Sequence, residues 1–128
     1  MEEDSYEVSL RGNNLQTFGY LVGAVFRQCL INVGLSADTH VYDLPRFRIR
    51  RYHATPSGIY VLRVAAIYDH LPEMEQRVFL AEFLEKGRHY PFWYLEVCEP
   101  MEYKAICKKT LLDISHLMKQ VEEPNDEK

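Results

Sequence analysis

Two groups of basic side chains are the residues of this chain best suited to binding chemistry. The first group lies near the C-terminus and comprises Glu102, Lys104, Ala105, Lys108 and Lys109. Lysine ammonium groups pair with phosphates, and a glutamate can accept a hydrogen bond from the amino group of cytosine. These five positions lie away from most of the apolar residues of a predicted helix. Together they favour contact with double-stranded DNA, with the solvated face of an amphipathic helix as the plain alternative.

The second group is a set of four arginines within six positions. Its members are Arg46, Arg48, Arg50 and Arg51. Phe47, Ile49 and Tyr52 are interleaved with them, and this near-alternation predicts a short strand or an extended arm. An arm could reach into a minor groove or follow the phosphates of DNA. An edge strand kept soluble by arginine is the alternative interpretation.

Other chemistry is poorly supported by the sequence. Four potential zinc ligands recur every nine residues: His89, Cys98, Cys107 and His116. Structural zinc sites usually pair ligands that lie a few residues apart, so we interpret this spacing as coincidence and expect no metal and no cofactor. The chain has no glycine-rich phosphate loop, no Gly-x-Ser-x-Gly elbow and no His-Glu-x-x-His motif, and it is therefore not expected to be an enzyme. Trp93, between two aromatic residues, is expected to lie in the core.

The elements that must position these residues are predicted to be helices. Apolar residues with helical spacing follow Asn13 or Asn14 and end near Gly34. A connection over 35–57 precedes a helix that starts at Gly58. The fold class is therefore predicted to be mainly α, with room for a short β segment near 46–52.

The C-terminal half predicts helices in an order that fits a helix-turn-helix. A helix opens at Pro72 and stops near Gly87, a short helix covers 92–97, and a longer helix covers 101–118. The first helices of such a plan hold the last one at a fixed angle, so that it can enter a major groove. The last helix is then the predicted recognition helix. The segment 121–128 is acidic, contains a proline and is expected to be disordered.

A family resemblance supports this plan. Leu71-Pro72, Gln76-Arg77-Val78-Phe79-Leu80 and Phe83-Leu84 resemble the opening helix of the fourth region of bacterial sigma factors. The stretch from Tyr103 to Leu112 is similar to the last helix of ArpU/RinA-type phage regulators. The resemblance implies control of phage late genes through DNA binding. It also implies that the lysines at 104, 108 and 109 contact DNA, whereas Tyr103, Ile106, Leu111 and Leu112 are structural.

Length and composition set the wider limits. The chain has 128 residues, 47% of them hydrophobic, and a formal net charge of −4. We expect an N-terminal helix with its connecting arm over 1–57, a sigma-like region over 58–118 and an acidic tail over 119–128. An acidic N-terminus and three cysteines without a close pair predict a cytoplasmic protein with free thiols. No apolar run is long enough to cross a membrane.

Two functions follow as hypotheses. The first is a sequence-specific DNA-binding transcription regulator of phage type. The alternative is a protein–protein interaction module that binds RNA polymerase or another regulator without contacting DNA, as the acidic balance of 71–118 would suit. A homodimer suits either hypothesis, because the 15–33 helix has a wide apolar face.

Overall fold

Helices make up the structure, a computed structural model that describes the backbone of residues 2–122 and the side chains of residues 14–120. The five α-helices are α1 (Glu2–Asn32), α2 (Arg46–Tyr52), α3 (Pro56–His70), α4 (Glu73–Val78) and α5 (Pro100–Glu122). Three shorter turns are η1 (Val41–Asp43), the π-helical η2 (Phe79–Leu84) and η3 (Trp93–Glu96). No strand occurs within residues 2–122, so the predicted mainly α fold is confirmed.

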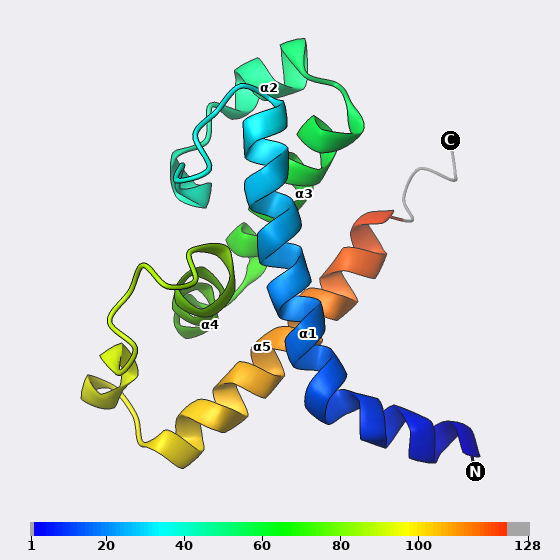
Figure 1. The fold of residues 1–128 in the computed structure, drawn as a ribbon, viewed down its shortest axis with the longest axis vertical. Helices are drawn as coiled ribbons and strands as arrows, with labels where there is room; N and C mark the ends of the chain where they lie inside the picture. The colour runs from blue at the N-terminus through cyan, green and yellow to red at the C-terminus, as the bar shows by residue number, and fades with distance from the viewer. Residues whose placement is uncertain (1, 123–128) are drawn as a thin grey trace.

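The long helix α1 is the axis around which the other elements pack (Figure 1). It contacts α3, η2 and α5, and its inward face buries Val22, Phe26 and Leu30. Gly23 allows the closest approach, since a Cβ there would stand 2.1 Å from the carbonyl oxygen of Phe83. This spacing fixes η2 against the middle of α1.

The ends of α1 differ from the prediction in one respect. The helix begins at Glu2 and not at Asn13 or Asn14. The predicted stop is confirmed, because the backbone turns away at Gly34 with a φ of 83°, a conformation that glycine adopts without strain.

The segment 35–57 is more structured than predicted. Residues 46–52 form a helix, and neither a strand nor an extended arm. The reason is packing: Ile49 alone among the interleaved apolar residues is buried, whereas Phe47 and Tyr52 are exposed. In a strand, Phe47 and Ile49 would share one face, but a helix directs them to different sides.

Helix α3 also starts earlier than predicted, at Pro56. The side chain of Thr55 caps it by accepting a hydrogen bond from the Gly58 N–H at 3.1 Å. A proline in the first helical turn costs nothing, because its missing N–H would have no partner there.

The C-terminal half follows the predicted order of elements. After α4 and η2, a loop carries Gly87 at a φ of 87° and leads to η3. This short helix spans Trp93–Glu96 and lies within the helix predicted for 92–97. The last helix, predicted for 101–118, spans Pro100–Glu122. The first residues of the acidic tail predicted for 119–128 are therefore helical, because α5 continues to Glu122, and residues 123–128 lie outside the described part of the chain. Within the described part of the chain, no helix has the length and apolar character to cross a membrane.

Candidate nucleic-acid interface

The lysine group predicted for the recognition helix is divided by the structure. Lys109 Nζ donates to Glu75 Oε2 at 2.9 Å and to Asp113 Oδ2 at 2.8 Å. These hydrogen bonds raise the pKa of Lys109 above its usual range. Glu75 is buried against α5, and its burial raises its own pKa. Lys109 therefore ties α5 to α4, and its charge is neutralised by two carboxylates.

Glu102 also has an internal role. One of its carboxylate oxygens accepts from the backbone N–H of Glu99 at 3.4 Å. A glutamate at the third helical position that reaches back to the residue before the helix forms one half of a capping box. The carboxylate predicted to read a cytosine therefore helps to begin α5.

Lys104, Ala105 and Lys108 remain exposed. The two lysines line a cleft of about 450 Å³ between α1, η2 and α5, together with Leu15, Phe83 and Leu111. Glu82 lies on the same cleft, so its charge opposes theirs. The field at this end of α5 is weakened further by the exposed Glu96 and Glu99 beside the helix start.

An aromatic cluster sets the position of η3 on α5. The rings of Tyr94 and Tyr103 stack with centroids 3.7 Å apart, and Trp93 meets Tyr103 edge-on at 5.7 Å. The guanidinium of Arg77 lies 4.6 Å from the Trp93 ring centroid, and the hydroxyl of Tyr103 donates to Glu82 at 2.5 Å. Burial and that hydrogen bond raise the pKa of Tyr103 above its usual range. As predicted, Trp93 packs against the core, although it stays partly exposed.

Helix α2 is held on the body of the protein by one side. Ile49 is buried there, and Arg46 forms two hydrogen bonds with Asp69 of α3, at 2.7 and 3.2 Å. These bonds raise the pKa of Arg46. Beyond the end of α2, the carbonyl oxygen of His53 would lie 1.8 Å from a Cβ at Gly58. Arg46 therefore holds α2 on α3 through Asp69, and the other three arginines of the predicted group are considered separately.

The opposite side of α2 carries the other three arginines. Successive helical residues are rotated by about 100°, so Arg50, Phe47, Arg51, Arg48 and Tyr52 follow one another around the exposed arc. Phe47 and Tyr52 are 71% and 65% exposed, and the Arg51 guanidinium lies 5.5 Å from the Tyr52 ring centroid. No ion pair of these three arginines is found among the described side chains. Their charge is therefore available to a partner.

The helical form of α2 decides which surface of DNA it fits. An α-helix with its side chains is about 10–12 Å across. The minor groove of B-DNA is about 6 Å wide and the major groove about 12 Å. The extended arm predicted for this segment is therefore wrong, because residues 46–52 form a helix, and a helix of this width is too broad for a minor groove.

The two predicted parts of the interface do not come together. Helix α2 lies at the upper end of the molecule in Figure 1, and the N-terminal half of α5 lies at the lower end. A single surface that combines the arginines with Lys104 and Lys108 does not exist in this arrangement. Each group must be weighed separately.

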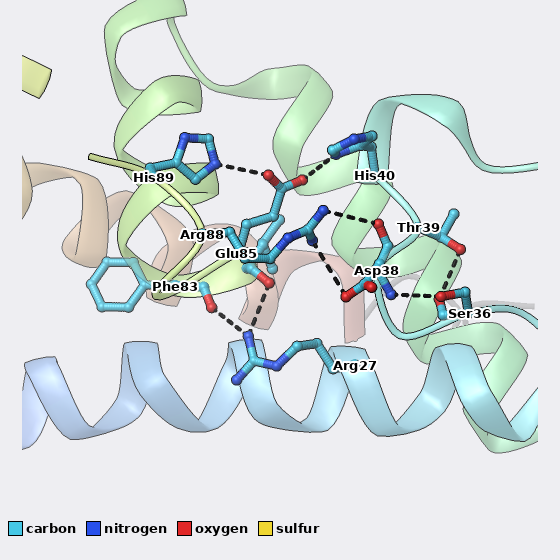
Figure 2. A network of polar contacts seen from close by, with 10 residues as sticks. Arg27, Ser36, Asp38, Thr39, His40, Phe83, Glu85, Arg88 and His89 are labelled. Atoms are coloured by element: carbon cyan, nitrogen blue, oxygen red, sulfur yellow. Dashed lines mark hydrogen bonds and ion pairs between the residues drawn. The ribbon is translucent and has the colours of Figure 1, made fainter. Parts of the chain in front are cut away.

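A buried polar network that the sequence did not reveal fixes the chain just before α2. Glu85, 5% exposed, accepts from His40 Nδ1 at 2.5 Å and from His89 Nε2 at 2.8 Å (Figure 2). Burial raises the pKa of Glu85, but the hydrogen bonds from the two histidines outweigh it and the net pKa is lowered. Arg88 adds a hydrogen bond to the carbonyl of Asp38 at 3.3 Å.

The same picture shows how η2 is joined to α1. The guanidinium of Arg27 donates to the carbonyl oxygens of Phe83 and Leu84 at 2.8 and 2.9 Å. The last carbonyls of a helix lack partners within the helix, and Arg27 satisfies two of them. Only the Glu85–His89 spacing of four residues could have indicated part of this network, because His40 is 45 residues away.

Neither a metal centre nor a known relative defines the site. Among the described side chains, no group of three His, Cys, Asp or Glu residues is placed to hold a metal ion. Comparisons with family models, with curated proteins and with solved structures found no match to this chain. The resemblance to sigma-like phage regulators therefore stays a prediction, and the functional argument depends on the geometry of α2 and α5.

Proposed function

We propose that the protein is a transcription regulator that binds double-stranded DNA, and that α2 is the helix that faces the duplex. The observation that carries this proposal is the exposed arc of α2, where Arg48, Arg50 and Arg51 have no acidic partner among the described residues. Phosphate contacts by lysine and arginine supply a large share of the affinity of DNA-binding proteins. The proposal therefore depends on the local charge of this helix, because the whole chain has a net charge of −4.

The arrangement of α2 suits this role in two further ways. Guanidinium groups can bind a phosphate or the edge of a guanine with two hydrogen bonds, and Phe47 can contact a thymine methyl group. The anchor formed by Ile49, Arg46 and Asp69 holds the helix in place before binding. A helix that is already ordered loses little conformational entropy when it binds.

A titration of two matched variants against a labelled mixed-sequence duplex at low salt tests the proposal. In the α2 variant, Arg48, Arg50 and Arg51 are changed to Gln. In the control, Lys104 and Lys108 are changed to Gln. We expect the α2 variant to lose about 100- to 1000-fold in affinity near 0.1 M salt, because each lost phosphate contact removes about 0.9 log unit there. The control is expected to lose less than about threefold, because carboxylates already weaken the field around its lysines.

Either of two results would reject this assignment. Equal losses in both variants would return α5 to the role of recognition helix. No binding by the wild-type chain, even at low salt, would end the DNA hypothesis altogether. Circular dichroism of both variants checks that the helices are intact.

A second candidate function is favoured by a different observation. The segment 90–101 exposes five large apolar side chains, and Met101 is 80% exposed. The other four are Tyr90, Phe92, Leu95 and Val97. Exposed apolar groups of this density are typical of protein interaction sites. As a protein–protein interaction module, the chain would bind purified RNA polymerase through this segment, and Leu95→Asp with Val97→Asp would abolish that binding without changing affinity for DNA.

A further inference from the structure

The segment 90–101 is acidic as well as apolar. Glu96, Glu99 and Glu102 are exposed among its apolar side chains or directly after them. The nearest exposed lysine along α5 is Lys104. These three carboxylates therefore face a single ammonium group nearby. Tyr90 and Phe92 meet edge to face, with ring centroids 5.9 Å apart. We call 90–102 the acidic apolar end.

Helix α2 offers a surface of the opposite kind. It presents Phe47 and Tyr52 beside Arg48, Arg50 and Arg51. Aromatic residues and arginine are the side chains most enriched where proteins bind each other tightly. Both surfaces therefore combine exposed apolar groups with charge, and their charges have opposite signs.

The two surfaces cannot meet within one molecule. In Figure 1, α2 lies at one end of the longest axis and the loop that leads into α5 lies towards the other. Contact between them requires two molecules. One molecule would contribute α2 and the other would contribute the acidic apolar end. A contact between two different surfaces of identical chains is head-to-tail.

We propose that this chain associates with itself head-to-tail, with α2 of one copy seated on the acidic apolar end of the next. Arginines of one copy meet Glu96 and Glu99 of the other, and Phe47 and Tyr52 cover the apolar side chains between them. In a pair joined this way, one copy still has a free acidic apolar end and the other still has a free α2. Assembly therefore continues with concentration until the chain of molecules closes or is capped.

Assembly of this kind also has a consequence that rests on the proposed function. DNA and the acidic apolar end of a second copy would both occupy the arginines of α2. A duplex should then dissociate the assembly, and assembly should lower the affinity for DNA. Self-association itself does not depend on whether the chain binds DNA.

Charge-swap variants studied by sedimentation test the contact. Variant A carries Arg48→Glu and Arg51→Glu, and variant B carries Glu96→Arg and Glu99→Arg. The wild-type chain should exceed its monomer mass of 15.1 kDa as concentration rises from about 1 μM to about 1 mM. Each variant alone should remain a monomer, because it has one altered surface and like charges would face each other. Mixed in equal amounts, A and B should associate again, with the two variants alternating along the assembly.

Association returns because the acidic apolar end of A and the α2 of B are both unaltered. The substituted surfaces, α2 of A and the end of B, also carry opposite charges. A chain with all four substitutions keeps the net charge of −4 and should associate again. The matched control, Lys104→Glu with Lys108→Glu, shifts the net charge as far as variant A but should still assemble. Glu96→Gln with Glu99→Gln provides a milder variant that should weaken assembly if variant B fails to fold.

The outcomes separate the two proposals. A wild-type chain that stays a monomer throughout this range overturns the head-to-tail contact, as does association that persists in variant A. Association in the wild type without association in the A and B mixture overturns it too. If the wild-type chain assembles but does not bind a duplex even at low salt, the contact stands and the proposed DNA function fails.

Discussion

Helix α2 and the N-terminal half of α5 carry similar basic residues but present them differently. In α2, three of four arginines point away from the protein and only Arg46 is paired, with Asp69. In α5, Lys109 is paired with two carboxylates, and Lys104 and Lys108 line a cleft that also contains Glu82. What differs is the set of elements packed beside each helix.

The comparison teaches that a basic cluster must be judged by what the fold places next to it. Helix α5 is packed against α4 and η3, and α4 supplies the buried Glu75 that takes Lys109. Helix α2 packs mainly on α3 and needs only Ile49 and Arg46 for its contact. The shorter helix therefore leaves more of its charge for a partner.

The largest expected effect comes from displacing α2 from α3. A Cβ at Gly58 would stand 1.8 Å from the carbonyl oxygen of His53, which is backbone and cannot turn aside. We expect Gly58→Ala to lower the free energy of unfolding by about 3 kcal/mol, as overpacking at a rigid contact does. It should also weaken DNA binding.

Urea unfolding and the DNA titration measure these two effects. Gly34→Ala is the matched control, because nothing lies within 4 Å of its added Cβ and only its φ of 83° is strained. The control should cost about 1 kcal/mol and leave DNA binding unchanged. Equal stability of the Gly58→Ala variant and the wild type would show that α2 is not held at this point.

A second prediction concerns the buried Glu85 that fixes the chain ahead of α2. Its pKa is lowered from the ordinary 4.5, so its charged form stabilises the folded state at pH values above about 4.5. We expect Glu85→Gln to lower the free energy of unfolding by about 1–2 kcal/mol at neutral pH, because two hydrogen bonds to a charged acceptor are weakened. The difference from the wild type should shrink as the pH falls through the lowered pKa.

Glu75, the α4 residue that accepts a hydrogen bond from Lys109 of α5, should change stability with pH in the opposite direction. Its pKa is raised from 4.5, first by burial, so the folded state favours its protonated form. Stability from this group is present below about pH 4.5 and is lost as the pH rises through the raised pKa. Glu75→Gln should therefore reduce the loss of stability with rising pH. Denaturation midpoints measured over a pH series distinguish the two, and slopes of the same sign would contradict one of the two assignments.

A smaller effect is expected within the aromatic cluster of α5. Tyr103→Phe keeps the stack on Tyr94 but removes the hydrogen bond to Glu82. The free energy of unfolding should fall by about 1 kcal/mol. Affinity for DNA should not change, because this half of α5 does not face the duplex. A clear loss of DNA binding, seen without loss of helix content, would favour α5 over α2.

Regular helices with a wide apolar face could be predicted from the sequence. The inward residues of α1 follow helical spacing, and the positive φ of Gly34 marks its end. The order of the elements from α4 to α5 was also evident, because Leu71-Pro72 and Glu99-Pro100 interrupt the helices. In these segments, local sequence and tertiary packing favour the same structure.

The candidate site was harder to predict because it depends on contacts between distant residues. Alternation of arginine and apolar residues over 46–52 suggested an extended segment, but packing buries only Ile49 and a helix results. The pairing of Lys109 with Glu75 joins residues 34 positions apart. The bond between His40 and Glu85 spans 45 positions. Such pairs have no local signature.

The salt dependence of DNA binding tests the central claim most directly. Affinity of the wild-type chain for a mixed-sequence duplex would be measured over a series of salt concentrations, beside the variant with Arg48, Arg50 and Arg51 changed to Gln. Each phosphate contact contributes about 0.9 to the slope of log affinity against log salt, so the slope should become shallower by about 2.7 in the variant. A slope unchanged by the three substitutions would contradict the assignment of α2 as the DNA-binding helix.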